Sequence, residues 1–344
     1  KLLVLKIKVY KVGGAVRDSL LGVDASDNDW VVIGSSPEEM ISKGYKPIGK
    51  DFPVFLHPET KEEYALARTE RKSGTGYHGF TFYYGKDVTI EEDLLRRDFT
   101  INAIAQDKDG NIIDPHNGTD DLEQKIFRHV SDAFHEDPLR AIRLARFYSY
   151  AHLSDFKISE STVEHVEKIV ESNELSELLP DRVWAEVSKS LDNKNPNKFF
   201  EKIISLNLKS PFFENLNSAV CDTHPNKLIR WCELQINNSF LLGQSLPIPK
   251  KLQHSSNCLR SLSMISRDID KSELLSLIYA IDFKANSELI KELKVLPNLI
   301  ESLEYISKLE KKINEADFSI LAKFSKEKVK EEKDKIYKDI ISQL

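Results

Sequence analysis

The glycines of this chain are confined almost entirely to its first third. Twelve of the thirteen glycines lie at or before Gly118, and Gly243 is the only later one. Glycine-rich turns between short β-rich segments are typical of a mixed α/β domain. The later sequence is rich in Leu, Ile, Lys, Glu and Ser at helical spacing. The asymmetry therefore predicts an α+β first part followed by a mostly helical remainder.

Apolar alternation and flanking glycines predict individual elements in the first part. Strands are expected at residues 7–12, 29–34, 52–56, 62–68 and 79–84, and helices at 14–21, 36–43 and 98–106. From about Glu136 a helical period takes over, in "EDPLRAIRLARFYSYA", "RVWAEVSKSL", "NPNKFFEKIISL" and the charged C-terminal segment. The N-terminal "KLLVLKIKVYKV" carries lysines throughout, so we expect it to form the first strand rather than a signal peptide.

Length, charge and cysteine content narrow the class of protein. A chain of 344 residues can form two or more domains, and its apolar runs are too short to span a membrane. The net charge of −6 argues against a general nucleic-acid coat but allows a local basic groove. Cys221, Cys232 and Cys258 follow no disulfide framework, which fits a reduced, cytoplasmic protein. Nearby His224 and His254 make only a weak zinc pattern, so buried apolar roles are favoured for these cysteines.

Two aspartates stand one residue apart in front of an apolar strand, in "SDNDWVV". Asp27 and Asp29 point to the same face of an extended chain, where their charges repel unless a cation lies between them. Alone, such a pair is more often a polar turn. Upstream, "VGGAVRDSLLG" places Gly13 and Gly14 before a helix that carries Arg17, so backbone amides and a guanidinium can meet a phosphate. The combination favours phosphoryl transfer assisted by two metal ions.

Other polar residues follow in the same part of the chain. Glu63 shares a strand face with Ala65 and Ala67 and is a candidate third carboxylate, with an exposed edge charge as an equal alternative. The segment "RTERKSGTGYHGF" is expected to be a mobile loop. In "LLRRDFTINAIA", Arg97 is expected to meet a phosphate, and Asp98 either to cap a helix or to reach a ribose hydroxyl.

Six segments, in order, resemble the class II CCA-adding enzymes, bacterial tRNA nucleotidyltransferases of the polymerase-β-like superfamily. They are "GGAVRD", "DNDWVV", "DFPVFLHPETKEEYALARTERKSGTGYHGFTFY", "RRDFTINAIAQD", "IIDPHNGTDDL" and "HEDPLRAIRLARF". The resemblance is dense from about residue 8 to about 205. It implies an α+β nucleotidyltransferase head with a mixed sheet at 1–130, an all-α neck at 131–205, and a helical body and tail at 206–344. The implied activity is addition of C, C and A to tRNA 3′ ends from CTP and ATP, without a nucleic-acid template.

The resemblance also implies roles for individual residues. Asp27 and Asp29 would bind the two Mg²⁺ ions, with Glu63 as the third catalytic carboxylate. The residues expected to hold the nucleotide are Gly13, Gly14, Arg17, Arg97, Asp98, Glu136, Asp137, Arg140, Arg143 and Arg146.

Base selection follows from two of these side chains. Cytosine and adenine both present an amino donor beside a ring-nitrogen acceptor, which match the Asp137 carboxylate and the Arg140 guanidinium. Uracil and guanine present a carbonyl and an N–H instead, so each would leave a buried charge unpaired. Glu136 is expected to steady Arg140.

The sequence departs from the resemblance after about residue 205. Relatives with this N-terminal half often carry an HD phosphohydrolase domain, but none of the nine histidines here is followed by Asp. We therefore expect no phosphatase, phosphodiesterase or nickel-dependent activity. The helical tail is expected to bind the acceptor stem and T-arm of tRNA through phosphate contacts, and no membrane or protein partner is implied.

Several activities remain as alternatives. They are an enzyme that adds only CC or only A, a poly(A) polymerase, and a non-catalytic RNA-binding paralogue. Relatives that add only CC tend to lack the loop after the third strand, so the presence of "RTERKSGTGYHGF" favours complete CCA addition.

Overall fold

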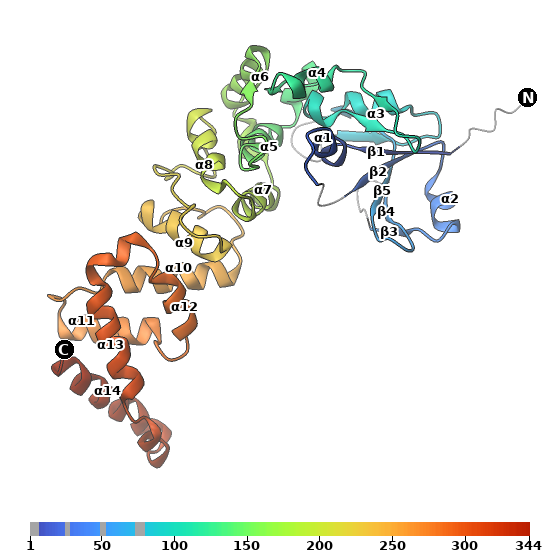
Figure 1. Ribbon diagram of the computed structural model, residues 1–344. Helices are drawn as coiled ribbons and strands as arrows, with labels where there is room; N and C mark the ends of the chain where they lie inside the picture. Colours follow the sequence, from blue (N-terminus) through green and yellow to red (C-terminus); the bar gives the residue numbers. More distant parts are fainter. Residues whose placement is uncertain (1–6, 25–27, 49–52, 73–79) are drawn as a thin grey trace, which may run out of the picture. The chain divides into compact units, whose positions relative to one another are not determined.

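A computed structural model describes the chain outside residues 1–6, 25–27, 49–52 and 73–79. The chain forms two compact units, Lys1–Pro211 and Phe212–Leu344. The first unit holds a mixed sheet and helices α1 to α8, and the second holds helices α9 to α14 (Figure 1). The expected α+β head followed by a helical remainder is therefore confirmed. Within the described residues, no helix is both long and apolar enough to cross a bilayer.

The head is built on a sheet that has seven strands in the described part of the chain, in the order β3-β4-β5-β2-β1-β8-β9. The bounds are β1 (Lys8–Val12), β2 (Asp29–Ile33), β3 (Lys46–Pro47), β4 (Val54–Leu56), β5 (Glu63–Leu66), β8 (Ala105–Gln106) and β9 (Ile112–Ile113). Strand β2 runs parallel to β5, and the other neighbouring pairs are antiparallel. The strands predicted near residues 7–12, 29–34, 52–56 and 62–68 are confirmed, with shorter bounds.

Alternating side chains give the sheet two apolar faces. Val12 and Val31 pack in one cluster with Leu94 of α3 (Ile90–Leu95). Val32 follows Val31 along β2 and so points to the opposite face, where it packs with Met40 of α2 (Pro37–Ser42). Together with α1 (Gly14–Leu20), helix α2 confirms two of the three helices predicted for this part.

The helix predicted at residues 98–106 is wrong. The segment forms a single 3₁₀ turn, η2 (Thr100–Asn102), and then strand β8, in which Ala105 pairs with Val12. Its apolar residues are completely buried, and a short apolar run fits a buried strand as well as a helix. Pairing with β1, more than 90 residues away in the chain, decides between the two.

The loop predicted from Arg68 to Phe80 is also partly wrong. Strand β6 (Thr69–Lys72) pairs with β7 (Phe80–Tyr83) in an antiparallel ladder. The expected strand near 79–84 is therefore confirmed, and part of the predicted loop forms the strand that pairs with it. The glycines of this segment, which carried the loop prediction, fall in residues 73–79, outside the described residues.

Aromatic rings connect the sheet to the helices that follow it in the same unit. The ring of Phe99 is completely buried and meets the rings of Phe127, Phe134 and Phe147 edge-on, at centroid distances of 5.7, 5.3 and 5.7 Å. Phe147 ends α5, which packs against α7 and α8. The helix bounds are α4 (Gly118–Glu123), α5 (Leu139–Phe147), α6 (Glu160–Glu171), α7 (Pro180–Asp192) and α8 (Pro196–Ser205).

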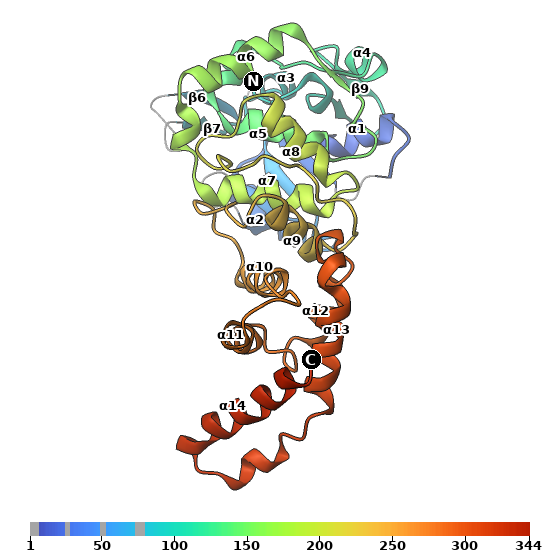
Figure 2. The ribbon, with the colours of Figure 1, turned by 90° about the vertical axis from the view of Figure 1, so that its left-hand side faces the viewer.

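The described residues of the second unit form helices and connecting turns. The bounds are α9 (Lys227–Asn237), α10 (Lys250–Ser263), α11 (Lys271–Ile281), α12 (Ser287–Leu293), α13 (Leu303–Glu315) and α14 (Lys326–Ser342). Helix α14 packs on α11 and α13. The end of the chain lies beside α13, where Lys308 Nζ donates to the Leu344 carbonyl at 2.8 Å (Figure 2).

The three cysteines are buried in this second unit. Burial raises the pKa of Cys232 to about 12 and that of Cys258 to about 11, so these thiols stay protonated near neutral pH. The interpretation of the cysteines as buried apolar side chains is confirmed.

We expect Phe99→Ala to lower the free energy of unfolding by about 3–5 kcal/mol, because it empties the centre of the aromatic cluster. Urea unfolding followed by tryptophan fluorescence measures the loss. Phe324→Ala is the matched control, because the Phe324 side chain is exposed, and its effect should stay within about 0.5 kcal/mol. Equal losses in the two variants would contradict a packing role for Phe99.

Candidate active site

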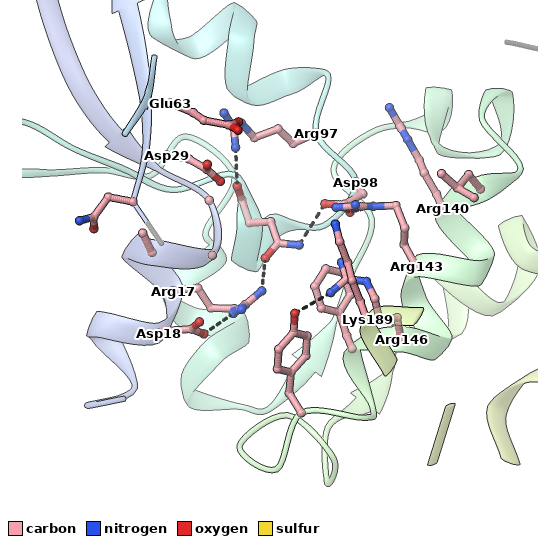
Figure 3. Close-up of a pocket in the computed structure, with 18 of the residues that line it drawn as sticks. Arg17, Asp18, Asp29, Glu63, Arg97, Asp98, Arg140, Arg143, Arg146 and Lys189 are labelled. Carbon is pink, nitrogen blue, oxygen red and sulfur yellow. Dashed lines mark hydrogen bonds and ion pairs between the residues drawn. The ribbon is translucent and has the colours of Figure 1, made fainter. Parts of the chain in front are cut away.

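A cleft of about 1340 Å³ opens in the first unit beside the sheet and helices α5 and α7. Figure 3 shows carboxylates of the strands on one side of this cleft and arginines of α5 on the other. The arginines that line it in the described chain are Arg17, Arg68, Arg96, Arg97, Arg140, Arg143, Arg146 and Arg182. So many cations around one opening favour an anionic ligand.

Two exposed carboxylates stand at the strand ends that border the cleft. Asp29 begins β2 and Glu63 begins β5, and the parallel pairing places the two residues directly opposite each other. Registered residues on neighbouring strands face the same side of a sheet, so the two carboxylates meet at one edge (Figure 3). Oxygen donors of this kind are the ligands that Mg²⁺ prefers. Asp27, the other predicted metal ligand, lies outside the described residues.

The turn from β1 into α1 brings backbone and guanidinium groups together. Gly13 has a φ of 68°, and a Cβ there would stand 3.0 Å from Arg97 Nη1. A Cβ on Gly14 would stand 3.4 Å from Arg17 Nη2. The two glycines therefore leave room for two arginines against bare backbone. Arg17 is buried, and its Nη1 donates to Asn102 Oδ1 at 2.7 Å.

Hydrogen bonds continue from Asn102 to Asp98 and from Asp98 to Arg143. Asn102 Nδ2 donates to Asp98 Oδ1 at 3.0 Å, and the backbone N–H of Phe99 donates to the same oxygen at 2.9 Å. Arg143 donates through Nε and Nη2 to Asp98 Oδ2, at 2.9 and 2.7 Å. Burial disfavours the charged carboxylate, but Arg143 and Asn102 outweigh that cost and lower the pKa of Asp98.

These bonds bear on the ribose role predicted for Asp98. Four donors occupy the carboxylate, which is about the number that its lone pairs accept. A ribose hydroxyl can therefore bind Asp98 only if one present donor gives way. Arg143 is the side chain best placed to do so, because its guanidinium is about a third exposed.

A second buried carboxylate, Asp93 of α3, holds the arginines on the other side of the cleft. Asp93 Oδ1 accepts from Arg96 Nη2 at 2.8 Å, and Asp93 Oδ2 accepts from Arg97 Nη2 at 3.0 Å. Burial opposes ionisation of Asp93, but the charges of Arg96 and Arg97 outweigh it and lower its pKa to about 2. Arg97 Nε is buried and has no hydrogen-bond partner in the described part of the chain.

The two residues expected to select the base lie at the start of α5. Arg140 is buried, and it donates to the carbonyls of Arg96 at 2.7 Å and Ala133 at 3.3 Å. Asp137 accepts from the Leu139 N–H at 3.2 Å and from Arg182 Nη2 at 3.2 Å. Backbone carbonyls, rather than the expected Glu136, therefore hold Arg140 among the described contacts. Glu136 is half-buried and does not line the cleft.

Helix α7 supplies two basic cleft residues that sequence reasoning missed, Arg182 and Lys189. The buried Glu186 lies between them, and the spacings of four and three place all three on one face of α7. Glu186 accepts from Arg146 Nε, while Arg146 Nη1 donates to the Tyr150 hydroxyl at 2.7 Å. Lys189 lines the cleft, and its side chain has no hydrogen bond or ion pair to any described residue. The polar face of the segment "RVWAEVSK" is the sequence feature from which these residues could have been predicted.

Two family models match separate parts of the chain. Residues 9–128 match the poly A polymerase head domain, and residues 155–220 match the probable RNA and SrmB-binding site of polymerase A. The expected resemblance is thereby confirmed for the head.

Solved structures share the fold. The Bacillus stearothermophilus CCA-adding enzyme in complex with CTP has 24% sequence identity and a TM-score of 0.62, covering 86% of this chain and 78% of that one. A CCA-adding enzyme in complex with ATP has 24% identity and a TM-score of 0.64, and an apo form II structure has 22% and 0.66. Each of these two covers 97% of this chain and 87% of the other.

We expect Asp93→Asn to lower the free energy of unfolding by about 2 kcal/mol near pH 7, because the folded-state pKa of about 2 lies below the ordinary 3.8. A lowered pKa stabilises the fold above the unfolded-state value, and this contribution is lost as pH falls toward the folded-state value. The difference from wild type should thus narrow between pH 4 and pH 2, measured by urea unfolding. Asp109→Asn, at an exposed turn, is the control and should show no such difference.

Proposed function

We propose that this chain, whose residues 9–128 carry the head domain of the poly A polymerase family and whose fold is that of CCA-adding enzymes, adds C, C and A to the 3′ end of tRNA. In this reaction the tRNA 3′-hydroxyl attacks the α-phosphate of CTP or ATP, and pyrophosphate leaves. The observation that carries the proposal is the cleft itself, where paired strand carboxylates face a wall of arginines.

The triphosphate is proposed to bind at the turn of Gly13 and Gly14. Arg17 and Arg97 stand against this turn, because the missing Cβ atoms let both guanidinium groups approach the backbone, and one phosphate beside the turn can accept from both arginines and from backbone N–H groups. The buried Nε–H of Arg97, which has no partner in the described chain, gains an acceptor when a phosphate oxygen enters. Lys189, Arg143 and the other cleft arginines add positive charge around the same ligand.

Two Mg²⁺ ions are proposed to bind at the strand edge. Asp29 and Glu63 fit this role because both offer exposed carboxylate oxygens from registered strand positions, and Asp27 stays a predicted ligand beside them. Bound there, the metals supply neutralisation of phosphate charge and activation of the attacking hydroxyl. The residues of the chain meanwhile hold the nucleotide and choose its base.

Base choice is proposed to depend on Asp137 and Arg140. The two backbone carbonyls that hold Arg140 leave its other N–H groups to donate to a ring nitrogen. Arg182 and the Leu139 amide hold the Asp137 carboxylate, which keeps further acceptor capacity for an exocyclic amino group. Cytosine and adenine satisfy both partners, whereas uracil and guanine oppose both.

RNA contact is proposed for the helical part of the chain. Residues 155–220 match an RNA-binding model, and the neck at 131–205 and the tail at 206–344 are proposed to contact the tRNA acceptor stem and T-arm in the cytoplasm. A poly(A) polymerase is the second candidate, because the head-domain model carries that description.

The test is incorporation of labelled CTP and ATP into tRNA that lacks its 3′ CCA, with Mg²⁺ present. We expect a single CCA to be added per tRNA; CC alone, A alone or long A tails would each identify one of the alternatives.

Asp29→Asn should lower the rate of incorporation at least about 10³-fold with folding intact, because it removes a metal ligand. Asp24→Asn, at a nearby exposed position, is the matched control and should keep full activity. No incorporation by wild type would leave an RNA-binding paralogue.

Asp137→Ala is expected to relax base choice, because the carboxylate that repels a carbonyl oxygen is gone. Competition between UTP and CTP on the same tRNA should show discrimination falling by about 10- to 100-fold while incorporation continues. Asp181→Ala, on the exposed side of α7, controls for general effects of removing a carboxylate. Full discrimination by the Asp137 variant would refute selection by side chains.

A further inference from the structure

Two histidines and an aspartate meet in the first unit at a place that the proposed reaction does not use. His129, Asp132 and His165 each offer one ligand atom, and these atoms all lie within 4.8 Å of one another. None of the three lines the cleft. They come from three segments: His129 precedes η3 (Asp132–Glu136), Asp132 is the first residue of η3, and His165 lies in α6. We propose that these three side chains form a binding site for Zn²⁺ or a similar divalent transition metal.

The separation of the donor atoms fits a shared metal ion. His165 Nε2 lies 3.6 Å from Asp132 Oδ1, which is longer than a hydrogen bond. Two ligands held about 2.1 Å from a tetrahedral zinc lie about 3.4 Å apart. The pair is thus spaced for ligands of one ion. The Asp132 side chain is completely exposed, so it can close the remaining distance without disturbing the core.

The surroundings of His165 fix which of its ring nitrogens can bind a metal. Its side chain is only 7% exposed, and its Nδ1 is buried without a hydrogen-bond partner among the described residues. Its Nε2 faces Asp132 and is therefore the ligand atom, while Nδ1 carries the ring proton. The neighbouring His135 ring stacks on His165 at 5.4 Å and Phe134 lies edge-on at 6.2 Å, so the imidazole has a fixed orientation.

His129 is oriented as a metal ligand usually is, by a hydrogen bond from its other ring nitrogen. His129 Nδ1 lies 2.9 Å from Thr162 Oγ1, and Thr162 Oγ1 lies 2.8 Å from Ser159 Oγ. If Thr162 donates its proton to Ser159, its oxygen accepts from Nδ1–H and leaves the Nε2 lone pair available. Thr162 stands three residues before His165 on α6, so one helix both orients the first histidine and supplies the second.

The ligand set indicates which metals bind. Two imidazoles and one carboxylate suit Zn²⁺, Co²⁺, Ni²⁺ or Cu²⁺ better than Mg²⁺, which prefers oxygen donors. With three protein ligands, one coordination position stays open to water.

The test is a titration of the full-length chain, freed of metal by a chelator, with Zn²⁺ in competition with a chromophoric chelator and without nucleotide or Mg²⁺. We expect one tight site per chain. Asp132→Asn should weaken it about tenfold or more and His165→Gln at least as much. His254→Gln, which changes an exposed histidine one helical turn from Cys258, is the matched control and should leave this site unchanged.

The absorption spectrum of bound Co²⁺ distinguishes a site of histidine and aspartate ligands from a site that contains cysteine. The Co²⁺-loaded chain should show d–d bands of nitrogen and oxygen ligands without a thiolate charge-transfer band, which excludes a cysteine site in the second unit. Because Asp132 is fully exposed, Asp132→Asn should unfold normally in urea, so its loss of binding reports ligation rather than damage. Absence of one-site binding in wild type, retention of tight binding in either variant, or a thiolate band lost in His254→Gln would overturn the site.

Discussion

Buried carboxylates hold the arginines of the cleft in place. Asp98 accepts hydrogen bonds from Asn102, from a backbone N–H and from Arg143. Asp93 accepts hydrogen bonds from Arg96 and Arg97. Breaking a buried pair by removing one partner leaves an uncompensated charge, which usually costs several kcal/mol. The guanidinium groups are therefore fixed before any ligand arrives, and a phosphate meets donors that need little reorganisation.

The same pairs set the charge of the cleft. Each carboxylate neutralises part of the positive charge of the arginines it binds. Cationic groups without a carboxylate partner therefore contribute most of the remaining positive charge. Lys189 has no counterion in the described chain, and Arg97 keeps an unsatisfied buried N–H. Arg97 follows α3 and lies near Glu63, whereas Lys189 belongs to α7 and lies near Arg146 (Figure 3). The remaining positive charge therefore flanks the space in which a triphosphate is proposed to lie.

Elements whose structure is set by their own local sequence could be predicted from that sequence. The turn at Gly13 and the strand from Asp29 followed from glycine placement and alternation and formed as predicted. The helix predicted from about Glu136 also formed, with the shorter bounds Leu139–Phe147. Segment 98–106 did not, because its pairing with β1 is set by residues far away in the chain. Asn102 links two charged residues, yet a single asparagine in an apolar run gives no signal of that role.

The parallel pairing of β2 with β5 limits how the head domain can vary in length. Asp29 and Glu63 meet on one side only because their strands keep this register. Deleting or inserting a single residue in the connection that slid β5 by one position would turn Glu63 to the opposite side of the sheet, together with every apolar neighbour on that strand. A shift of β5 by two positions would return Glu63 to the original side of the sheet, but it would move the Glu63 carboxylate along the strand and away from Asp29. Evolutionary change in the β2–β5 connection should therefore be absorbed in its loops, leaving the strand alignment untouched.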